Sequence, residues 1–402
     1  MSSGTKRPAS PTASLEPTSK QAKVEVAQTP VFELNVLHWL RNNTDHSRNN
    51  NRNRSTQSPP VVVQEPQEIA CYSVALDKIH YGSREQLHRY QKPALKTTNL
   101  GDKIDEWIQS CDNDKPLVET ILDALTSDQI ANADVITFRN NLNKIGGTIF
   151  NPKNDWELEC TLLDDDNNKT LYLDVLPGNP PQEPPPKDSL QYKLQYYGYR
   201  FESVCTGQQD APVDNRYEFC SVLRLNMGDT RIVLAAEMDA TTVRTSTSTT
   251  SVRDYVELKT MRPIRGDRDL QSLYRYRYPK YWLQSYLAGI PTIVVGERTD
   301  EGQLVDVRSV PVSRMHGEAL SFFRGDDRKC WNPQTVIRWI HHVLGMLKSV
   351  CLKHPHRTIH VQYKGESRQI VGYLRDDDDG TDVIGKRLLA RQKNGTTGTS
   401  HK

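Results

Sequence analysis

Apolar residues recur at helical spacing in several stretches of the chain. In residues 187–204, where Asp188 or Ser189 can serve as the N-cap, four apolar positions fall on one helical face: Leu190, Leu194, Tyr197 and Phe201. Residues 270–289 also predict a helix, with Pro279 as a point where it can break, because proline lacks the backbone N–H that a helix interior needs.

Residues 331–350 predict a buried helix. Asn332 is a suitable N-cap, and Pro333 suits the first turn. The apolar positions that follow are Val336, Ile340, Val343, Leu344 and Leu347. This spacing places them on one side of the helix, so we expect that side to face the core.

Between the helices, alternating patterns predict strands. Residues 218–240 read as a hairpin with its turn near Met227, Gly228 and Asp229, and residues 254–260 as a further strand. Residues 290–311 read as a second hairpin. Because strands and helices are interspersed, the predicted class is α/β or α+β, with mixed β-sheets flanked by helices.

Both ends of the chain differ in composition from the middle. Residues 1–66 and 376–402 are predicted to be disordered tails around a domain at 67–375, because polar residues dominate them. One apolar island, residues 31–40, is a partner-binding segment, a transiently collapsed apolar patch or a strand that docks on the domain. The acidic run Asp376–Asp379 is interpreted as a solvated tail and not as a metal site.

Bulk composition narrows the class of protein further. The 402 residues carry a net charge of only +2, so any basic surface must be local. The 7 cysteines include no CxxC pair, which predicts reduced thiols inside the cell. We expect neither a membrane span nor secretion, since the chain lacks an apolar stretch of about 20 residues and a signal segment. The basic clusters "TKRP" and "SKQAK" are consistent with nuclear import.

Charged residues interrupt two of the predicted strands at a spacing of two. Glu237 and Asp239 share one strand face, while Ile232, Leu234, Ala236 and Met238 point the other way. By the same parity, Glu257 and Lys259 share a face while Val256 and Leu258 pack. If these strands are neighbours, three carboxylates and one ammonium group occupy one small volume.

Three clustered carboxylates repel one another unless a cation lies between them. Oxygen ligands select Mg²⁺ or Mn²⁺, and two such ions can clamp the attacking and leaving oxygens of a phosphoester or phosphoanhydride. Lys259 could then orient water or stabilise developing charge. The alternative is that both pairs are solvated residues in cross-strand salt bridges, and spacing alone favours that alternative.

The combination of motifs resembles the DXO-like decapping exoribonuclease family over most of residues 68–350. The matching pieces, in the order of the family, are "TFRNNL", "DWELEC", "GYRFES", "EFCSVLR", "EMDA", "YVELKT", "YWLQSYLAGIPTIVVG" and "RKCWNP". The family is related to the PD-(D/E)XK nucleases. Its members hydrolyse defective or non-canonical RNA 5′ ends in nuclear RNA quality control.

The resemblance implies roles for individual residues. It implies Mg²⁺ or Mn²⁺, with two ions expected, held by Glu202, Glu237, Asp239, Glu257 and the carbonyl of Leu258. Lys259 matches the catalytic lysine. The implied substrate contacts are Arg89, Phe138, Arg139, Asn140, Cys220, Glu237, Lys259 and Gln284.

Some parts of the sequence depart from the family or carry a separate signal. Phe138 stands where relatives often have Trp, and Asn140 where some have Gly. The segment 173–189 is unusually rich in proline. Residues 262–286 interleave arginines with Tyr and Trp, a pattern typical of single-stranded RNA binding but also of an amphipathic helix whose aromatic residues are core.

The sequence therefore predicts a metal-dependent hydrolase of RNA 5′ ends that acts on incomplete, unmethylated, triphosphate or NAD caps, with 5′-to-3′ exoribonuclease activity in many members of the family. The alternative is a non-catalytic partner that stabilises a nuclear 5′-to-3′ exoribonuclease. A DNA nuclease of the wider superfamily is a third hypothesis. We expect a nuclear location, with a cytoplasmic one left open.

Overall fold

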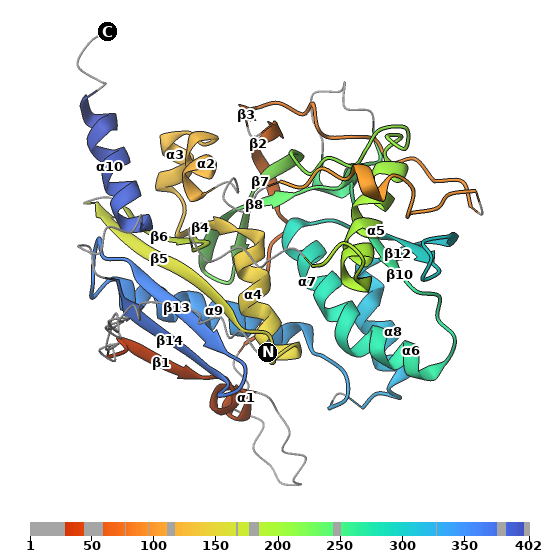
Figure 1. The fold of residues 1–402 in the computed structure, drawn as a ribbon. Helices are drawn as coiled ribbons and strands as arrows, with labels where there is room; N and C mark the ends of the chain where they lie inside the picture. Colours follow the sequence, from red (N-terminus) through yellow and green to blue (C-terminus); the bar gives the residue numbers. More distant parts are fainter. Residues whose placement is uncertain are drawn as a thin grey trace, which may run out of the picture.

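The computed structural model describes residues 29–43, 59–76, 78–95, 97–110, 117–165, 168–176, 185–243, 251–326, 328–375 and 383–397. The two basic clusters near the N-terminus and the run Asp376–Asp379 lie outside the described residues. Within the described part, strands form a large and a small sheet, and helices pack on both (Figure 1).

The large sheet is mixed. Its 10 strands lie in the order β1 (Phe32–Asn35), β14 (Gln369–Leu374), β13 (Ile359–Lys364), β5 (Trp156–Asp165), β6 (Asn168–Asp174), β4 (Val135–Phe138), β8 (Thr230–Glu237), β7 (Tyr217–Met227), β2 (Gln67–Ala75) and β3 (Lys78–Tyr81). Strand β4 is parallel to both of its neighbours, and the other pairs are antiparallel.

The small sheet contains the second charged strand. Its order is β12 (Leu304–Pro311), β11 (Thr292–Arg298), β10 (Tyr255–Met261) and β9 (Ala240–Thr241). Strand β9 follows β8 after only Met238 and Asp239, so this part of the chain passes directly from the large sheet to the small one. The junction of the two sheets therefore lies at the motif "EMDA".

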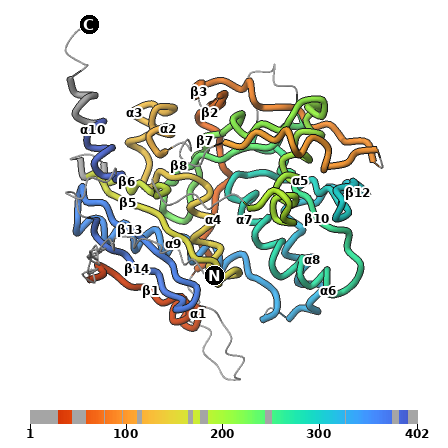
Figure 2. Tube along the Cα trace, viewed as in Figure 1, coloured from red at the N-terminus to blue at the C-terminus, as the bar shows by residue number. Residues whose placement is uncertain are grey.

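Helices cover the sheets and connect them. They are α1 (Val36–Asn43), α2 (Val118–Asp123), α3 (Ser127–Ala131), α4 (Arg139–Phe150), α5 (Leu190–Cys205), α6 (Asp267–Ser272), α7 (Tyr278–Ala288), α8 (Met315–Phe322), α9 (Pro333–Cys351) and α10 (Ile384–Thr397). Single 3₁₀ turns are η1 (Ile104–Glu106), η3 (Val252–Asp254) and η5 (Val312–Arg314). Figure 2 shows α4 beside α7 between the two sheets.

Two of the predicted helices are confirmed with their caps. The Ser189 hydroxyl accepts a hydrogen bond from the N–H of Tyr192 at the start of α5, and Asn332 accepts one from Thr335 at the start of α9. These side chains satisfy N–H groups that have no partner in the first turn. The five apolar positions predicted for α9 are all buried.

The third helix is longer than predicted and is not broken at Pro279. A π-helical turn, η4 (Leu273–Arg277), joins α6 to α7 immediately before this proline. In a regular helix the Pro279 ring would press against the carbonyl of Arg275, which here lies in the wider turn. The wider turn therefore lets the helix continue.

The predicted hairpins and strand parity are confirmed. Strands β7 and β8 pair around Gly228, which has a φ of 61°, and β11 pairs with β12. Ile232, Leu234, Ala236 and Met238 pack in the main apolar core, and Val233 and Ala235 pack in another cluster on the opposite face. Burial of both faces fixes the register of β8, because a shift by one residue would exchange the two sets.

The prediction of disordered tails is wrong for the parts that the structure describes. Strand β1 pairs with β14, and the Phe32 ring covers Gly372 at a place where a Cβ atom would clash with it. Trp39 packs on Trp339 with 4.9 Å between ring centroids. The apolar island is thus a docked strand and helix, because burial of these rings outweighs the polar composition around them.

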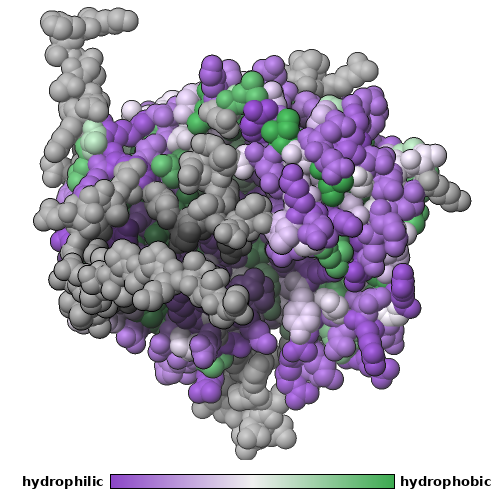
Figure 3. Space-filling model, in the orientation of Figure 1, coloured by the Kyte–Doolittle hydropathy of each residue, from purple (hydrophilic) through white to green (hydrophobic). Residues whose placement is uncertain are grey.

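The C-terminal segment also packs on the domain through α10. Arg387 bonds to Asp174 at 2.6 Å and to Glu119 at 2.6 Å, while Ile384 and Leu388 are buried. The domain therefore extends beyond the predicted boundaries of 67 and 375. On the face shown in Figure 3 the surface is mainly hydrophilic, with apolar residues in small separate areas. Within the described ranges, no helix combines the length and apolar character that a bilayer-spanning segment needs.

Candidate active site at the junction of the two sheets

Asp239 connects the end of the large sheet to the charged strand of the small sheet. Its Oδ2 accepts a hydrogen bond of 2.6 Å from the backbone N–H of Leu258. Strand β9, which follows Asp239, pairs with β10 through Ala240 opposite Val256 and Thr241 opposite Tyr255. This pairing brings Asp239 alongside the motif "ELK" of β10.

The expectation that the two charged strands are neighbours is therefore wrong in detail. Strands β8 and β10 belong to different sheets, and Asp239 lies beyond the end of β8. The two-residue strand β9 makes the connection, and it is too short to leave a periodic signal in the sequence. The predicted clustering of the side chains nevertheless results, because β9 sets the register.

Glu257 is fully buried at the centre of this junction. Its carboxylate accepts hydrogen bonds from the Lys259 ammonium group and from the side-chain amide of Gln284 on α7. The Arg139 guanidinium lies 3.5 Å from its other oxygen. Lys259 also lies 3.8 Å from Asp239 and donates to the carbonyl of Leu258 at 3.0 Å.

Arg139 joins three elements at this junction. It is the first residue of α4, directly after β4, and its side chain is buried. Besides Glu257, it donates to the carbonyl of Glu237 at 3.1 Å and to the carbonyl of Gln284 at 3.4 Å. Its guanidinium thus fixes the positions of β8, β10 and α7 relative to one another.

The electrostatics of the site show an excess of negative charge. Burial, together with the charges of Asp239 and Glu237, raises the pKa of Glu202 on α5 well above its usual value. Burial and the Glu257 charge raise the pKa of Asp239 to about 7. Glu257 differs: burial opposes its charge, but Lys259 and Arg139 outweigh burial and lower its pKa.

Glu237 contributes a fourth carboxylate at the end of β8. Burial and the charge of Glu218 raise its pKa to about 7. Because the Glu237 residue is exposed to solvent, we attribute this rise in its pKa mainly to the Glu218 charge. The two cations Lys259 and Arg139 thus face four predicted ligand carboxylates.

The donor set suits a hard divalent cation. Carboxylate oxygens are the ligands that Mg²⁺ and Mn²⁺ prefer, and the raised pKa values indicate that the site has too few cations. Among the described residues, no three His, Cys, Asp or Glu side chains already stand in coordinating positions. The residues therefore fit a divalent cation by their donor atoms and their charge. The Glu257 and Asp239 carboxylates accept hydrogen bonds from protein groups, and the Leu258 carbonyl accepts one from Lys259.

The remaining predicted contacts lie around this centre. Cys220 on β7 stands opposite Glu237 in the register of the large sheet, and Phe138 precedes Arg139 at the start of α4. Arg89 is exposed in a segment that bridges to Thr241 of β9. Asn140 is exposed in the first turn of α4.

Sequence reasoning missed two residues that border the site. Glu218 lies two residues before Cys220 on β7 and raises the pKa of Glu237. Tyr199 lies one helical turn before Glu202 on α5, and burial with the charges of Glu237, Glu202 and Glu218 raises its pKa to about 12. The signals available in the sequence were the spacing of two between Glu218 and Cys220 on a strand and of three between Tyr199 and Glu202 on a helix, since each spacing places both side chains on one face.

Comparison with known proteins supports the resemblance. The sequence profile of the family described as "RAI1 like PD-(D/E)XK nuclease" matches residues 64–391. The decapping nuclease RAI1 of Aspergillus fumigatus is 28% identical over 357 residues, which is 82% of this chain and 93% of that protein. The human decapping and exoribonuclease protein is 26% identical over 327 residues, covering 75% of this chain and 79% of that protein.

Solved structures show the same fold. The crystal structure of Schizosaccharomyces pombe Rai1 has a TM-score of 0.67 at 23% identity and covers 80% of this chain and 97% of that one. Candida albicans Rai1 in complex with pU5-Mn²⁺ has a TM-score of 0.68 at 20% identity, covering 83% and 94%. The fold class predicted from the sequence is thereby confirmed. The chain belongs to the RAI1-like PD-(D/E)XK nuclease family.

Proposed function

We propose that this protein is a divalent-metal-dependent hydrolase of RNA 5′ ends, that is, a decapping nuclease. One observation carries the proposal: carboxylates from α5, the end of β8, the linker before β9, and β10 gather around Lys259. The names of the similar proteins, decapping nuclease and decapping and exoribonuclease protein, support this reaction class.

The ligands proposed for Mg²⁺ or Mn²⁺ are Glu202, Glu237, Asp239, Glu257 and the carbonyl oxygen of Leu258. Two structural neighbours, C. albicans Rai1 and Kluyveromyces lactis Dxo1, were solved with manganese, and Scheffersomyces stipitis Rai1 with calcium. A divalent ion held by these groups lowers the pKa of a bound water and offsets charge on phosphoryl oxygens.

Lys259 is proposed to act as a charged donor and not as a base. Burial disfavours its charge, but the charges of Glu257, Asp239 and Glu202 outweigh burial and raise its pKa above its ordinary value. The ammonium group therefore stays protonated at neutral pH. It can orient the attacking water or donate hydrogen bonds to the charge that develops on the phosphoryl oxygens.

Two further residues position the acidic strand. Gln284 holds one oxygen of Glu257, and Arg139 approaches the other. Gln284 lies on α7 and Arg139 on α4, so two helices fix the Glu257 carboxylate before substrate arrives. The resemblance assigns Arg139, Gln284, Cys220 and Arg89 to substrate contact, and we retain these assignments as proposals.

The proposed substrates are RNAs with triphosphate, unmethylated-cap, incomplete-cap or NAD 5′ ends, with 5′-to-3′ exoribonuclease activity alongside. The test is incubation of the purified protein with RNAs that carry each end and with a DNA of matched sequence, in Mn²⁺ and in EDTA, with identification of the released products. Release of pyrophosphate, a cap dinucleotide or NAD only in Mn²⁺ supports the proposal. Intact 5′ ends on every RNA, or equal cleavage of DNA ends, contradict it.

The resemblance also supports a nuclear location and a binding role toward a nuclear 5′-to-3′ exoribonuclease. The two roles are separable by a variant with Asp239→Ala and Glu257→Ala. Hydrolysis requires these carboxylates, whereas binding through another surface does not. Co-purification of the double variant with the exoribonuclease supports the binding role, and loss of hydrolysis in the same variant assigns catalysis to this site.

A further inference from the structure

A ridge of exposed cations follows the long helix that contains Gln284. We define this basic ridge as six exposed residues that run from just before α6 through η4 to the start of α7: Arg265, Arg268, Arg275, Tyr276, Arg277 and Lys280. Tyr276 is 55% exposed, and the Arg275 guanidinium lies over its ring at 5.8 Å from the centroid. Asp267 and Asp269 are the acidic residues of the same stretch, so cations outnumber carboxylates along it.

More positive charge lies beside the ridge. Arg262 follows the end of β10 and pairs with Asp300 at 2.5 Å, and Arg298 of β11 approaches the same carboxylate at 3.5 Å. Burial and the charges of Arg262 and Arg277 lower the pKa of Arg298, although Asp300 opposes them. One carboxylate is thus shared by two guanidinium groups, with a third nearby, which leaves a local positive excess on a chain with a net charge of only +2.

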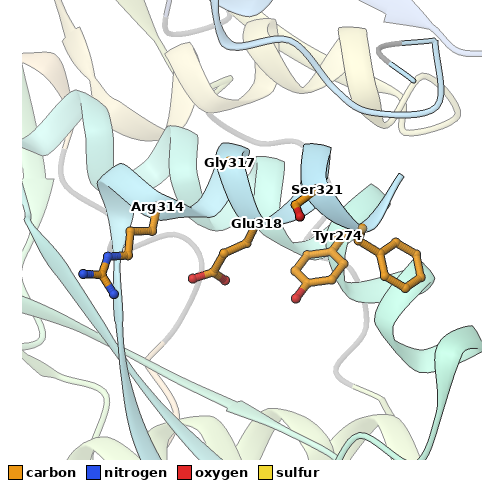
Figure 4. A pocket seen from close by; sticks show the side chains of 6 residues that line it. Tyr274, Arg314, Gly317, Glu318 and Ser321 are labelled. Atoms are coloured by element: carbon orange, nitrogen blue, oxygen red, sulfur yellow. The ribbon is translucent and has the colours of Figure 1, made fainter. Parts of the chain in front are cut away.

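A pocket of about 570 Å³ opens next to the π-helical turn. It is lined by Tyr274, Arg314, Gly317, Glu318, Ser321 and Phe322. Figure 4 shows Tyr274, Glu318 and Arg314 projecting to the same side of α8. The rings of Tyr274 and Phe322 lie 5.2 Å apart, and Glu318 accepts a hydrogen bond of 3.1 Å from the Tyr278 hydroxyl.

The pocket and the ridge offer complementary chemistry. Tyr274 and Phe322 present aromatic surface, on which a nucleobase can stack. The Glu318 carboxylate can accept a hydrogen bond from a base amino group, as acidic side chains do in base recognition. Arg314 and the cations of the basic ridge can pair with the phosphates on either side of that base.

The basic ridge and the candidate active site share one helix. The same helix carries Gln284, which contacts Glu257, and Arg277 precedes Gln284 by seven residues. At 1.5 Å per residue this separation is about 10 Å along the helix. At a stacked rise of about 3.4 Å per nucleotide, a chain whose 5′ end lies at the carboxylates therefore reaches the ridge with about its third nucleotide.

We propose that the basic ridge and the adjacent pocket bind the single-stranded body of the RNA, downstream of the 5′ end that is hydrolysed. This inference rests on the proposed function for the identity of the ligand. An acidic peptide could pair with the arginines, but it would not use the rings of Tyr274 and Phe322, and the Glu318 carboxylate would repel it. The combination of stacking surface, carboxylate and cations fits a nucleotide chain better.

The test is RNA binding in EDTA, where hydrolysis does not interfere, with 5′-monophosphate RNAs of two and fifteen nucleotides. The variant R275A/Y276A/R277A removes exposed groups, and R275Q/R277Q tests the charge alone if the first variant fails to fold. The control is Arg253→Ala, because Arg253 is exposed but paired with Glu65. Fluorescence anisotropy at several salt concentrations gives affinity and salt dependence.

We expect R275A/Y276A/R277A to bind the fifteen-nucleotide RNA about 10-fold more weakly, with a salt slope that falls by about one to two units. Binding of the two-nucleotide RNA by this variant stays unchanged, and the Arg253→Ala control binds both RNAs like the wild type. A ridge variant that keeps the affinity and salt slope of the wild type for the long RNA overturns the proposal and leaves the ridge to a protein partner. Failure of the proposed function has a different signature. In that case the wild type binds the RNA but leaves its 5′ end intact in Mn²⁺.

Discussion

The Arg139 guanidinium lies 3.5 Å from the Glu257 carboxylate, although Arg139 begins a helix that follows the large sheet and Glu257 lies on a strand of the small one. This pair crosses the junction at which the acidic residues gather. In the metal-free protein, Arg139 and Lys259 thus supply the positive charge that stabilises Glu257.

Arg139→Lys is expected to impair the site while keeping its charge. Lysine presents a single nitrogen, whereas Arg139 donates from separate nitrogens to the carbonyls of Glu237 and Gln284. We expect kcat with triphosphate-ended RNA to fall about 10- to 100-fold, the range typical for loss of a supporting contact. Steady-state kinetics check this, and unchanged kcat in the lysine variant would show that charge alone suffices.

Lys259→Met is expected to destabilise the metal-free protein by about 3 kcal/mol at pH 8, because it leaves the buried Glu257 carboxylate without its main partner. Adding Glu257→Gln removes that charge, so the double variant should recover most of the loss. Urea unfolding in EDTA measures both variants. Equal destabilisation in the single and double variants would mean that the pair does not interact as described.

The stability of the metal-free protein is expected to depend on pH through Asp239. Its pKa of about 7 exceeds the usual value near 3.9, so between these values the folded chain holds a proton that the unfolded chain releases. Stability therefore falls as pH rises through this window, by at most about 1.4 kcal/mol per pH unit for one such proton.

Asp239→Asn provides the measurement, because the amide oxygen can still accept from the Leu258 N–H but does not titrate. The free energy of unfolding of this variant relative to the wild type should rise between pH 5 and pH 7 in EDTA. A difference that stays constant with pH, or decreases, would contradict the raised pKa.

The docked N-terminal segment is expected to contribute to stability. Trp39 is 7% exposed and packs on Trp339, so Trp39→Ala should cost about 3 to 5 kcal/mol. Leu37 on the same helix is 40% exposed, and Leu37→Ala should change stability by about 0.5 kcal/mol or less. Similar costs for the two variants in urea unfolding would show that α1 does not dock as described.

Periodicity predicted the elements of the fold but not their arrangement. The capped helices at Ser189 and Asn332 and the hairpin at Gly228 have local signals, and all three are present. The assignment of β8 and β10 to different sheets has no local signal, because it depends on the two-residue strand β9. Docking of residues 31–40 was one alternative among those that the sequence left open, since a few buried rings inside a polar tail leave its average composition almost unchanged.

The site followed from sequence only in part. The spacings of Glu237 with Asp239 and of Glu257 with Lys259 predicted shared faces, but the motif resemblance was needed to add Glu202 from a distant helix. Glu218 was missed although it lies two residues before Cys220 on a predicted strand, because its effect on Glu237 depends on how β7 pairs with β8. The protein contacts of Arg139 were also missed, because they depend on how α4 and α7 pack beside the two sheets (Figure 2).

The central claim is that acidic residues from separate elements form one divalent-metal site. Titration of Mn²⁺ followed by electron paramagnetic resonance measures this binding directly, in the wild type and in a variant that carries Asp239→Asn and Glu257→Gln, with Glu65→Gln as an exposed acidic control. We predict that the wild type and the control bind Mn²⁺ and that the double variant loses this binding. Equal Mn²⁺ binding by all three proteins, or no binding by the wild type, would contradict the account.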